Sequence, residues 1–143
     1  MKDQSVWIEH FNMEGHDEGG YFYQVLKSDE RVQLEGQAER ALYTSIYFLL
    51  KSDNPYMITP EGNYETIKLG LDVEDGQVLQ AVVPKNTIFG SSVEDTDTYS
   101  LVSCMVSPGF EYEDFELFTR TELIEKYPDY QEMIKKLTLP DAE

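Results

Sequence analysis

Several residue types are scarce in this chain of 143 residues, and each scarcity excludes a class of protein. The single cysteine, Cys104, has no partner with which to form a disulfide within the chain. The two histidines, His10 and His16, are too few for a site in which a cluster of such side chains holds a transition metal ion. We therefore expect neither a disulfide scaffold nor a bound metal.

Basic residues are also scarce, because 11 Lys and Arg stand against 28 Asp and Glu and leave a net charge of -17. This charge repels nucleic acid and anionic membrane surfaces, so we expect neither as a partner. The longest apolar stretch, residues 41–50, is about half as long as a bilayer-crossing helix. The opening MKDQSVWIEH has no apolar run typical of a signal peptide, so we expect a cytoplasmic protein.

Motifs for nucleotide cofactors are missing as well, because the glycines form neither a Walker pattern nor a dinucleotide fingerprint. The chain does contain 41% hydrophobic and 13% aromatic residues, which is enough for one core. We expect a single domain over residues 1–143, with an N-terminal segment (1–18), a β core (19–118) and C-terminal helices (119–140).

Turn residues separate stretches that are rich in aromatic and β-branched residues, and these stretches predict strands. The stretch 41–50 is apolar at nearly every position, so both of its faces should be covered, and 99–106 should be a central strand. PEGN (60–63) should form a hairpin turn, with Pro60 and a left-handed Gly62 or Asn63. The predicted strands are 19–27, 41–50, 56–59, 64–69, 78–84, 87–93 and 99–106.

The hydrophobic period changes from two to between three and four after Thr119, which predicts two short helices. Thr119 or Thr121 can cap the first helix with Glu122 close behind, and Pro128 either starts the second helix or kinks the first. Strands joined by turns, with helices at one end, predict a mainly β fold with an antiparallel sandwich or barrel.

Few side chains are grouped in a way that favours chemistry. His16, Asp17 and Glu18 form either a metal half-site, an acid/base pair or a turn that caps the next strand. Cys104 lies within LVSCMV and should be a small buried hydrophobe. The carboxylates of FEYEDFELF (110–118) alternate with apolar residues, as on the exposed face of a strand. Tyr21, Tyr23 and Tyr47 either pack in the core or turn their hydroxyls toward a polar ligand.

Four tracts together resemble the cupin superfamily, in particular its small RmlC-like, sugar-epimerase-like jelly-roll branch. They are HDEGGYF from His16, TSIYFLL from Thr44, QAVVP from Gln80 and SLVSCMVSPGFEYEDFEL from Ser100. The resemblance implies an antiparallel jelly-roll barrel, a homodimer, and a pocket between two sheets that suits a small polar ligand.

The sequence departs from that family between Leu50 and Tyr56, where only KSDNP stands. The resemblance implies that about 20 residues, one hairpin with the first metal ligands, are missing there. The tract after Pro84, KNTIFGSS, has no histidine at the second ligand position. A metal-dependent cupin activity is therefore not carried over, and the lost hairpin exposes sheet edges.

Three functions remain open for such a protein: binding of a small sugar-like ligand without a metal, a metal-independent sugar-nucleotide epimerase or isomerase, and a structural or partner-binding protein with a collapsed pocket. We favour the first. Because side chains alternate between the two faces of a strand, Gln80 should lie on the same face of the predicted strand 78–84 as Val82. The predicted pocket residues are Glu18, Tyr21, Tyr23, Tyr47, Gln80 and Phe89.

Overall fold

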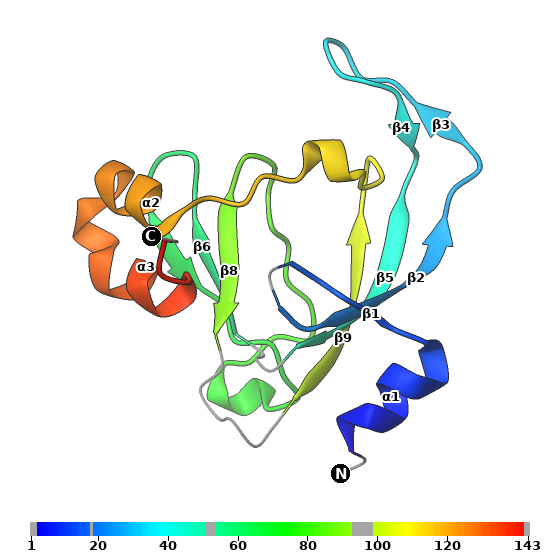
Figure 1. Ribbon diagram of the computed structural model, residues 1–143, viewed down its shortest axis with the longest axis horizontal. Coiled ribbons are helices and arrows are strands. Elements are labelled where there is room, and N and C mark those ends of the chain that lie inside the picture. The colour runs from blue at the N-terminus through cyan, green and yellow to red at the C-terminus, as the bar shows by residue number, and fades with distance from the viewer. Residues whose placement is uncertain (1–2, 18, 51–53, 93–98, 142–143) are drawn as a thin grey trace. The chain divides into compact units, whose positions relative to one another are not determined.

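The computed structural model describes residues 3–17, 19–50, 54–92 and 99–141 (Figure 1). Its contacts divide the chain into two compact units. The first unit comprises Met1–Leu50 and Tyr99–Leu117, and the second comprises Lys51–Thr98 and Phe118–Glu143. The expectation of one domain stays a prediction. No helix within the described residues is long and apolar enough to cross a membrane.

The described secondary structure is mostly β, with antiparallel strand pairs and three short α-helices, so the predicted class is confirmed. The jelly-roll arrangement stays a prediction. The elements of the first unit are α1 (Gln4–Phe11), β1 (Glu14–Gly15), β2 (Tyr21–Lys27), β3 (Arg31–Val32), β4 (Arg40–Ala41), β5 (Thr44–Leu50) and β9 (Ser100–Val106). Those of the second unit are β6 (Asn54–Ile58), β7 (Tyr64–Thr66), β8 (Ile88–Ser92), α2 (Arg120–Lys126) and α3 (Gln131–Leu137).

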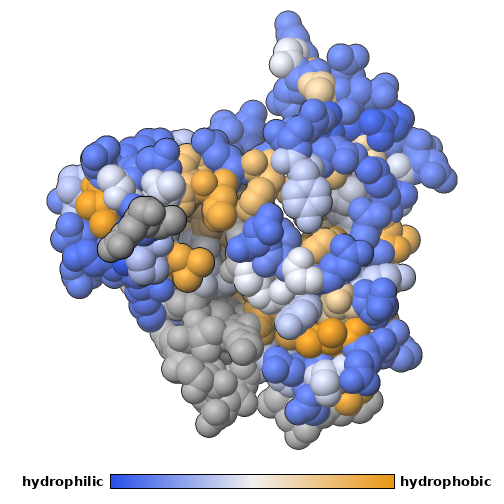
Figure 2. Space-filling view, in the orientation of Figure 1, coloured by the Kyte–Doolittle hydropathy of each residue, from blue (hydrophilic) through white to orange (hydrophobic). Residues whose placement is uncertain are grey.

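The first unit is built on a four-stranded sheet with the order β1-β2-β5-β9 (Figure 1). Strand β5 pairs with β2 on one side and with β9 on the other, and its residue Leu49 is only 1% exposed. The strand begins at Thr44, later than predicted, because Arg40 and Ala41 pair with β3 instead. Between β2 and β5 the chain forms the short β3–β4 hairpin, which is hydrophilic on the face drawn in Figure 2.

Strand β9 confirms the prediction of a strand at 99–106 but not its central position. Among the described residues β9 pairs only with β5, so it lies at an edge of the sheet. Ser103, Met105 and Val106 are exposed on it. An apolar composition predicts a strand, but it does not state how many neighbours that strand has.

The second unit contains the predicted hairpin. Strands β6 and β7 are joined through a turn in which Thr59 N–H donates to the Asn63 carbonyl oxygen (2.9 Å) and Gly62 has a positive φ of 84°. Strand β8 pairs with β6 on the other side. Tyr56, Met57 and Ile58 of β6 are all buried.

The two predicted C-terminal helices are confirmed as α2 and α3. The Thr119 side chain accepts a hydrogen bond from the Glu122 amide, and the Glu122 carboxylate accepts one from the Thr119 amide, which is the reciprocal N-terminal cap that the sequence predicted. Pro128 opens a 3-10 turn that leads into α3. The Tyr130 hydroxyl donates to the Gly62 carbonyl oxygen (2.9 Å), which ties this turn to the β6–β7 hairpin.

Two predicted strands are wrong. Residues 79–84 form no strand. Their backbone groups make no hydrogen bond to the backbone of any described residue. Gln80 is therefore exposed in a segment that pairs with no described strand, so the sheet face that it was predicted to share with Val82 is not formed by these residues. Residues 110–118 are not an exposed strand either, because Tyr112–Asp114 form a 3-10 turn within them.

Candidate functional site

The four-stranded sheet presents two chemically different faces. The register places Tyr23 opposite Tyr47 and Phe22 opposite Phe48. Since successive side chains of a strand point to opposite faces, the tyrosines share one face and the phenylalanines share the other. We call these the tyrosine face and the phenylalanine face.

Helix α1 packs on the tyrosine face. The ring of Phe11 lies 5.7 Å from that of Tyr23 and 5.1 Å from that of Tyr47, between ring centroids. The Trp7 ring stacks on Phe11, and its Nε1–H donates to the Tyr99 hydroxyl (2.8 Å). Tyr23 and Tyr47 thus both contact the apolar ring of Phe11 in α1, which is the arrangement expected of packing residues.

The phenylalanine face carries a histidine within a group of aromatic rings. The half-buried imidazole of His16 lies 5.6 Å from each of the rings of Phe22, Phe48 and Phe115, with interplanar angles of 73° to 85°. Such edge-to-face contacts are favourable for aromatic rings and fix the plane of the imidazole. The site therefore combines apolar walls with one group that both donates and accepts hydrogen bonds.

The turn between β1 and β2 positions His16. Its backbone N–H donates to the Gly20 carbonyl oxygen (3.2 Å), and its carbonyl oxygen accepts from the Gly19 amide (2.8 Å). Both glycines have a positive φ, and a Cβ at Gly20 would lie 2.6 Å from the carbonyl oxygen of Leu49. Only glycine can take this conformation so close to β5, which explains the GG that follows His16 in the sequence.

Hydrogen bonds of the segment before Phe115 attach it to the β4–β5 region. Gly109 N–H donates to the Ala41 carbonyl oxygen (2.7 Å), and Phe110 N–H donates to the buried Thr44 hydroxyl (3.0 Å). A Cβ at Gly109 would meet the side chains of Ala41 and Thr44 at 3.1 and 3.0 Å. This close contact holds the start of the segment against the sheet and so helps to place Phe115.

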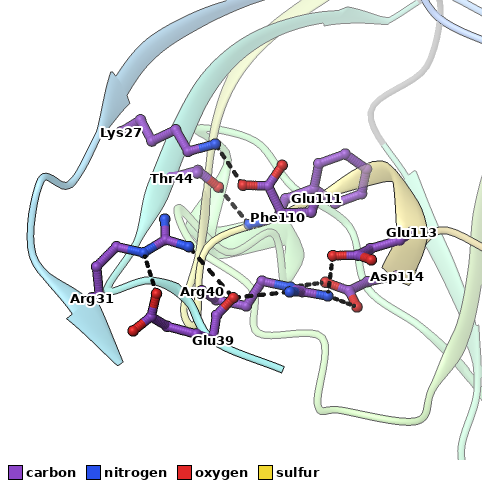
Figure 3. Close-up of polar contacts among 9 residues, drawn as sticks. All are labelled: Lys27, Arg31, Glu39, Arg40, Thr44, Phe110, Glu111, Glu113 and Asp114. Carbon is purple, nitrogen blue, oxygen red and sulfur yellow. Dashed lines mark hydrogen bonds and ion pairs between the residues drawn. The ribbon is translucent and has the colours of Figure 1, made fainter. Parts of the chain in front are cut away.

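Charged groups then fix the same segment (Figure 3). The Arg40 guanidinium contacts both oxygens of Asp114, at 2.7 and 2.8 Å, and Glu113 at 2.8 Å. Lys27 Nζ lies 2.5 Å from Glu111 Oε1. The hydrogen bond from Arg40 lowers the pKa of Asp114, and the one from Lys27 lowers the pKa of Glu111. These carboxylates are therefore structural partners of basic residues.

Cys104 of β9 lies opposite Ile46 of β5. Because Ile46 is two positions from Phe48, both it and Cys104 lie on the phenylalanine face. Burial raises the pKa of its thiol, which keeps it protonated and disfavours a role as nucleophile. Within the described ranges no three His, Cys, Asp or Glu side chains are grouped so as to hold a metal ion. The predicted cluster at His16 has its carboxylate Glu18 outside the described residues.

The predicted site residues thus fall in separate places. Tyr21, Tyr23 and Tyr47 lie on the tyrosine face, whereas Gln80 and Phe89 belong to the second unit and are exposed. The three phenylalanines around His16 were not among the residues predicted from the sequence. The alternation of side chains in YFY (21–23) and IYF (46–48) does separate Phe22 and Phe48 from the tyrosines. No local signal could indicate Phe115, because it belongs to a distant part of the chain that contacts the sheet.

Comparisons with known proteins agree with the fold. A family model described as cupin superfamily (DUF985) matches residues 5–56 and 54–118. The chain is 30% identical over 134 residues to the uncharacterized protein YML079W of Saccharomyces cerevisiae, with 69% of this chain and 67% of that protein covered.

Two solved structures are also similar, each with 36% sequence identity. A hypothetical protein from Leishmania major superimposes with a TM-score of 0.84 and covers 96% of this chain and 99% of its own. Protein SO0799 from Shewanella oneidensis superimposes with a TM-score of 0.85 and covers 99% of this chain and 100% of its own.

Proposed function

The chain belongs to the DUF985 family of the cupin superfamily, and from this premise we propose that it binds a small, neutral, sugar-like ligand without a metal ion. The proposed site is the phenylalanine face beside His16. The observation that carries the proposal is the half-buried imidazole among the rings of Phe22, Phe48 and Phe115. Ligand sites typically combine apolar and aromatic walls with a few placed polar groups.

A sugar fits this arrangement because it has apolar C–H faces and polar hydroxyl edges. The phenylalanine rings would contact a C–H face, and the imidazole would exchange hydrogen bonds with a hydroxyl. The net charge of -17 disfavours an anionic ligand, so a neutral sugar should bind more tightly than the same sugar on a nucleoside diphosphate.

The predicted ligand contacts Glu18, Tyr21, Tyr23, Tyr47, Gln80 and Phe89 stay a prediction, which the site proposed beside His16 replaces at the three tyrosines. Glu18 follows His16 by two positions in the sequence and lies outside the described residues. The three tyrosines lie on the opposite face of the sheet, so a ligand beside His16 would not touch them. Their variants therefore serve as matched controls.

The test is a thermal-shift titration of the whole protein with glucose, galactose, N-acetylglucosamine and uridine diphosphate glucose, with and without EDTA. We expect at least one neutral sugar to raise the Tm and EDTA to leave that rise unchanged. His16→Ala should abolish the rise, whereas Tyr23→Phe should retain it.

The same experiment separates the alternatives. A rise that survives His16→Ala and is lost in Tyr23→Phe or Tyr47→Phe would move the site to the tyrosine face. Tighter binding of the sugar nucleotide, with its turnover, would favour the epimerase. No response to any of the four compounds would contradict the proposal and favour the structural or partner-binding alternative.

A further inference from the structure

The phenylalanine face carries a second polar side chain, the amide of Gln24. Gln24 follows Phe22 by two positions in β2, before any shift of the register, so both side chains point to this face. Gln24 is exposed, and its side chain makes no hydrogen bond to any described residue. Its amide therefore offers one acceptor oxygen and two N–H donors to a molecule bound on this face.

A β-bulge directly after Gln24 changes which side chains continue this face. The register between β2 and β5 shifts there, so that Lys27 rather than Leu26 lies opposite Thr44. On this face Lys27 pairs with Glu111. The bulge thus replaces an apolar side chain with one that anchors a neighbouring segment, and such bulges are common beside binding sites because they redirect side chains.

The neighbours of Gln24 across the sheet are apolar or only weakly polar. The register places Ile46 opposite Gln24 and Cys104 opposite Ile46, and both of these neighbours are half-buried. We call these three residues the Gln24 row. Because residues two positions apart in a strand are about 7 Å apart, the Gln24 row lies about that far from Phe22 and Phe48. A substituent of a sugar bound at those phenylalanines can therefore reach it.

The Gln24 row combines an amide with apolar side chains, and one common sugar substituent has the same two parts. Resting on the proposed sugar site, we propose that the ligand is an N-acetylamino sugar whose acetamido group lies on the Gln24 row. The Gln24 amide would donate to the acetamido carbonyl oxygen and accept from its N–H, and the methyl group would contact Ile46 and Cys104. N-acetylglucosamine should then bind about tenfold more tightly than glucose.

The net charge of the protein predicts a different order of ligands. A charge of -17 by itself favours glucosamine, whose amino group is cationic, over the neutral N-acetylglucosamine. On the Gln24 row, however, an ammonium group would leave the Gln24 N–H donors without an acceptor and would lie against apolar side chains. The order of these two ligands therefore separates recognition by the Gln24 row from attraction by charge.

The test is isothermal titration calorimetry of the whole protein with N-acetylglucosamine, glucose and glucosamine. Gln24→Leu removes both hydrogen-bonding groups at similar size, so it should bind N-acetylglucosamine about tenfold more weakly and glucose within about twofold of the original protein. Gln24→Glu keeps acceptor oxygens, loses the donors and adds a negative charge, so it should bind glucosamine more tightly than N-acetylglucosamine.

The matched controls are Gln37→Leu and Gln37→Glu, at an exposed glutamine in the turn of the β3–β4 hairpin, and both should keep the original order of ligands. Circular dichroism checks that every variant is folded. Binding of glucose that is lost in His16→Ala, without a preference for N-acetylglucosamine, would overturn this inference and leave the proposed function standing. No binding of any of the three sugars would overturn both. A preference for glucosamine in the original protein, or a preference for N-acetylglucosamine that survives Gln24→Leu, would overturn the inference alone.

Discussion

Strand β5 and residues 79–84 contain similar side chains but have different backbone surroundings. TSIYFLL in β5 is hydrogen-bonded to β2 on one side and β9 on the other, and Leu49 within it is 1% exposed. QAVVP has no partner strand among the described residues, and Val82 within it is 72% exposed. Residues with high β propensity therefore form a strand only where a neighbouring strand is available to pair with them.

The largest predicted difference concerns the stability of these two regions. Leu49→Ala should lower the free energy of unfolding by about 2–5 kcal/mol, because it removes buried methyl groups and leaves a cavity. Val82→Ala should change it by no more than about 0.5 kcal/mol at a protein concentration that keeps the chain monomeric. Urea unfolding followed by circular dichroism measures both. Similar losses in the two variants would show that residues 79–84 are packed as tightly as β5.

The turn between β1 and β2 approaches β5 closely at one of its two glycines. Gly19 and Gly20 both have a positive φ, but only Gly20 lies against the Leu49 carbonyl oxygen. Gly19→Ala should cost about 1 kcal/mol, from the backbone conformation alone. Gly20→Ala should cost about 2 kcal/mol or more, because the turn must also move away from β5.

The same pair of variants reports on the proposed site. Gly20→Ala should shift the NMR signals of the His16 imidazole, since the turn carries that ring onto the phenylalanine face, whereas Gly19→Ala should shift them less. Equal effects of the two substitutions on both stability and His16 would contradict the close approach of Gly20 to β5.

Much of the fold could be predicted from the sequence, because the relevant signals are local. The alternation of GGYFYQVLK, the PEGN turn and the Thr119–Glu122 cap each involve residues that are neighbours along the chain. Within the described part of the chain, the edge position of β9 and the lack of a partner strand for residues 79–84 could not be predicted in this way. Both depend on which distant strand is present to pair, and residue types alone do not encode that.

The candidate site was predictable only in part for the same reason. The HDEGG tract singled out His16, and the four tracts shared with cupins indicated the family. The role of Phe115 depends on Arg40 and Asp114, which are 74 positions apart in the sequence and form the charged contact that helps to place it. The pattern of FEYEDFELF favoured an exposed strand because its charges suggested solvent, whereas these carboxylates pair with Arg40 and Lys27.

The smallest predicted effect concerns pH and the attachment of that segment to β4. The pKa of Asp114 is lowered in the folded protein, so its contribution to stability is present above the ordinary aspartate pKa of about 3.9 and is lost as the pH falls through the lowered value. Asp114→Asn should therefore flatten the decline of stability below about pH 5.

The matched control is Asp29→Asn, at an exposed aspartate that forms no ion pair with the described residues. It should leave the pH profile of urea unfolding close to that of the original protein. If both variants flatten the profile equally, the Arg40 contact is not what lowers the pKa of Asp114.

Amide hydrogen exchange at several protein concentrations tests most directly whether strand formation follows the availability of a partner. The amides of β5 should be protected at every concentration, because both neighbouring strands belong to the same chain. Amides within residues 79–83 should exchange freely, because no described strand pairs with them. Protection of these amides as strong as that of β5 would contradict the dependence of strand formation on a partner.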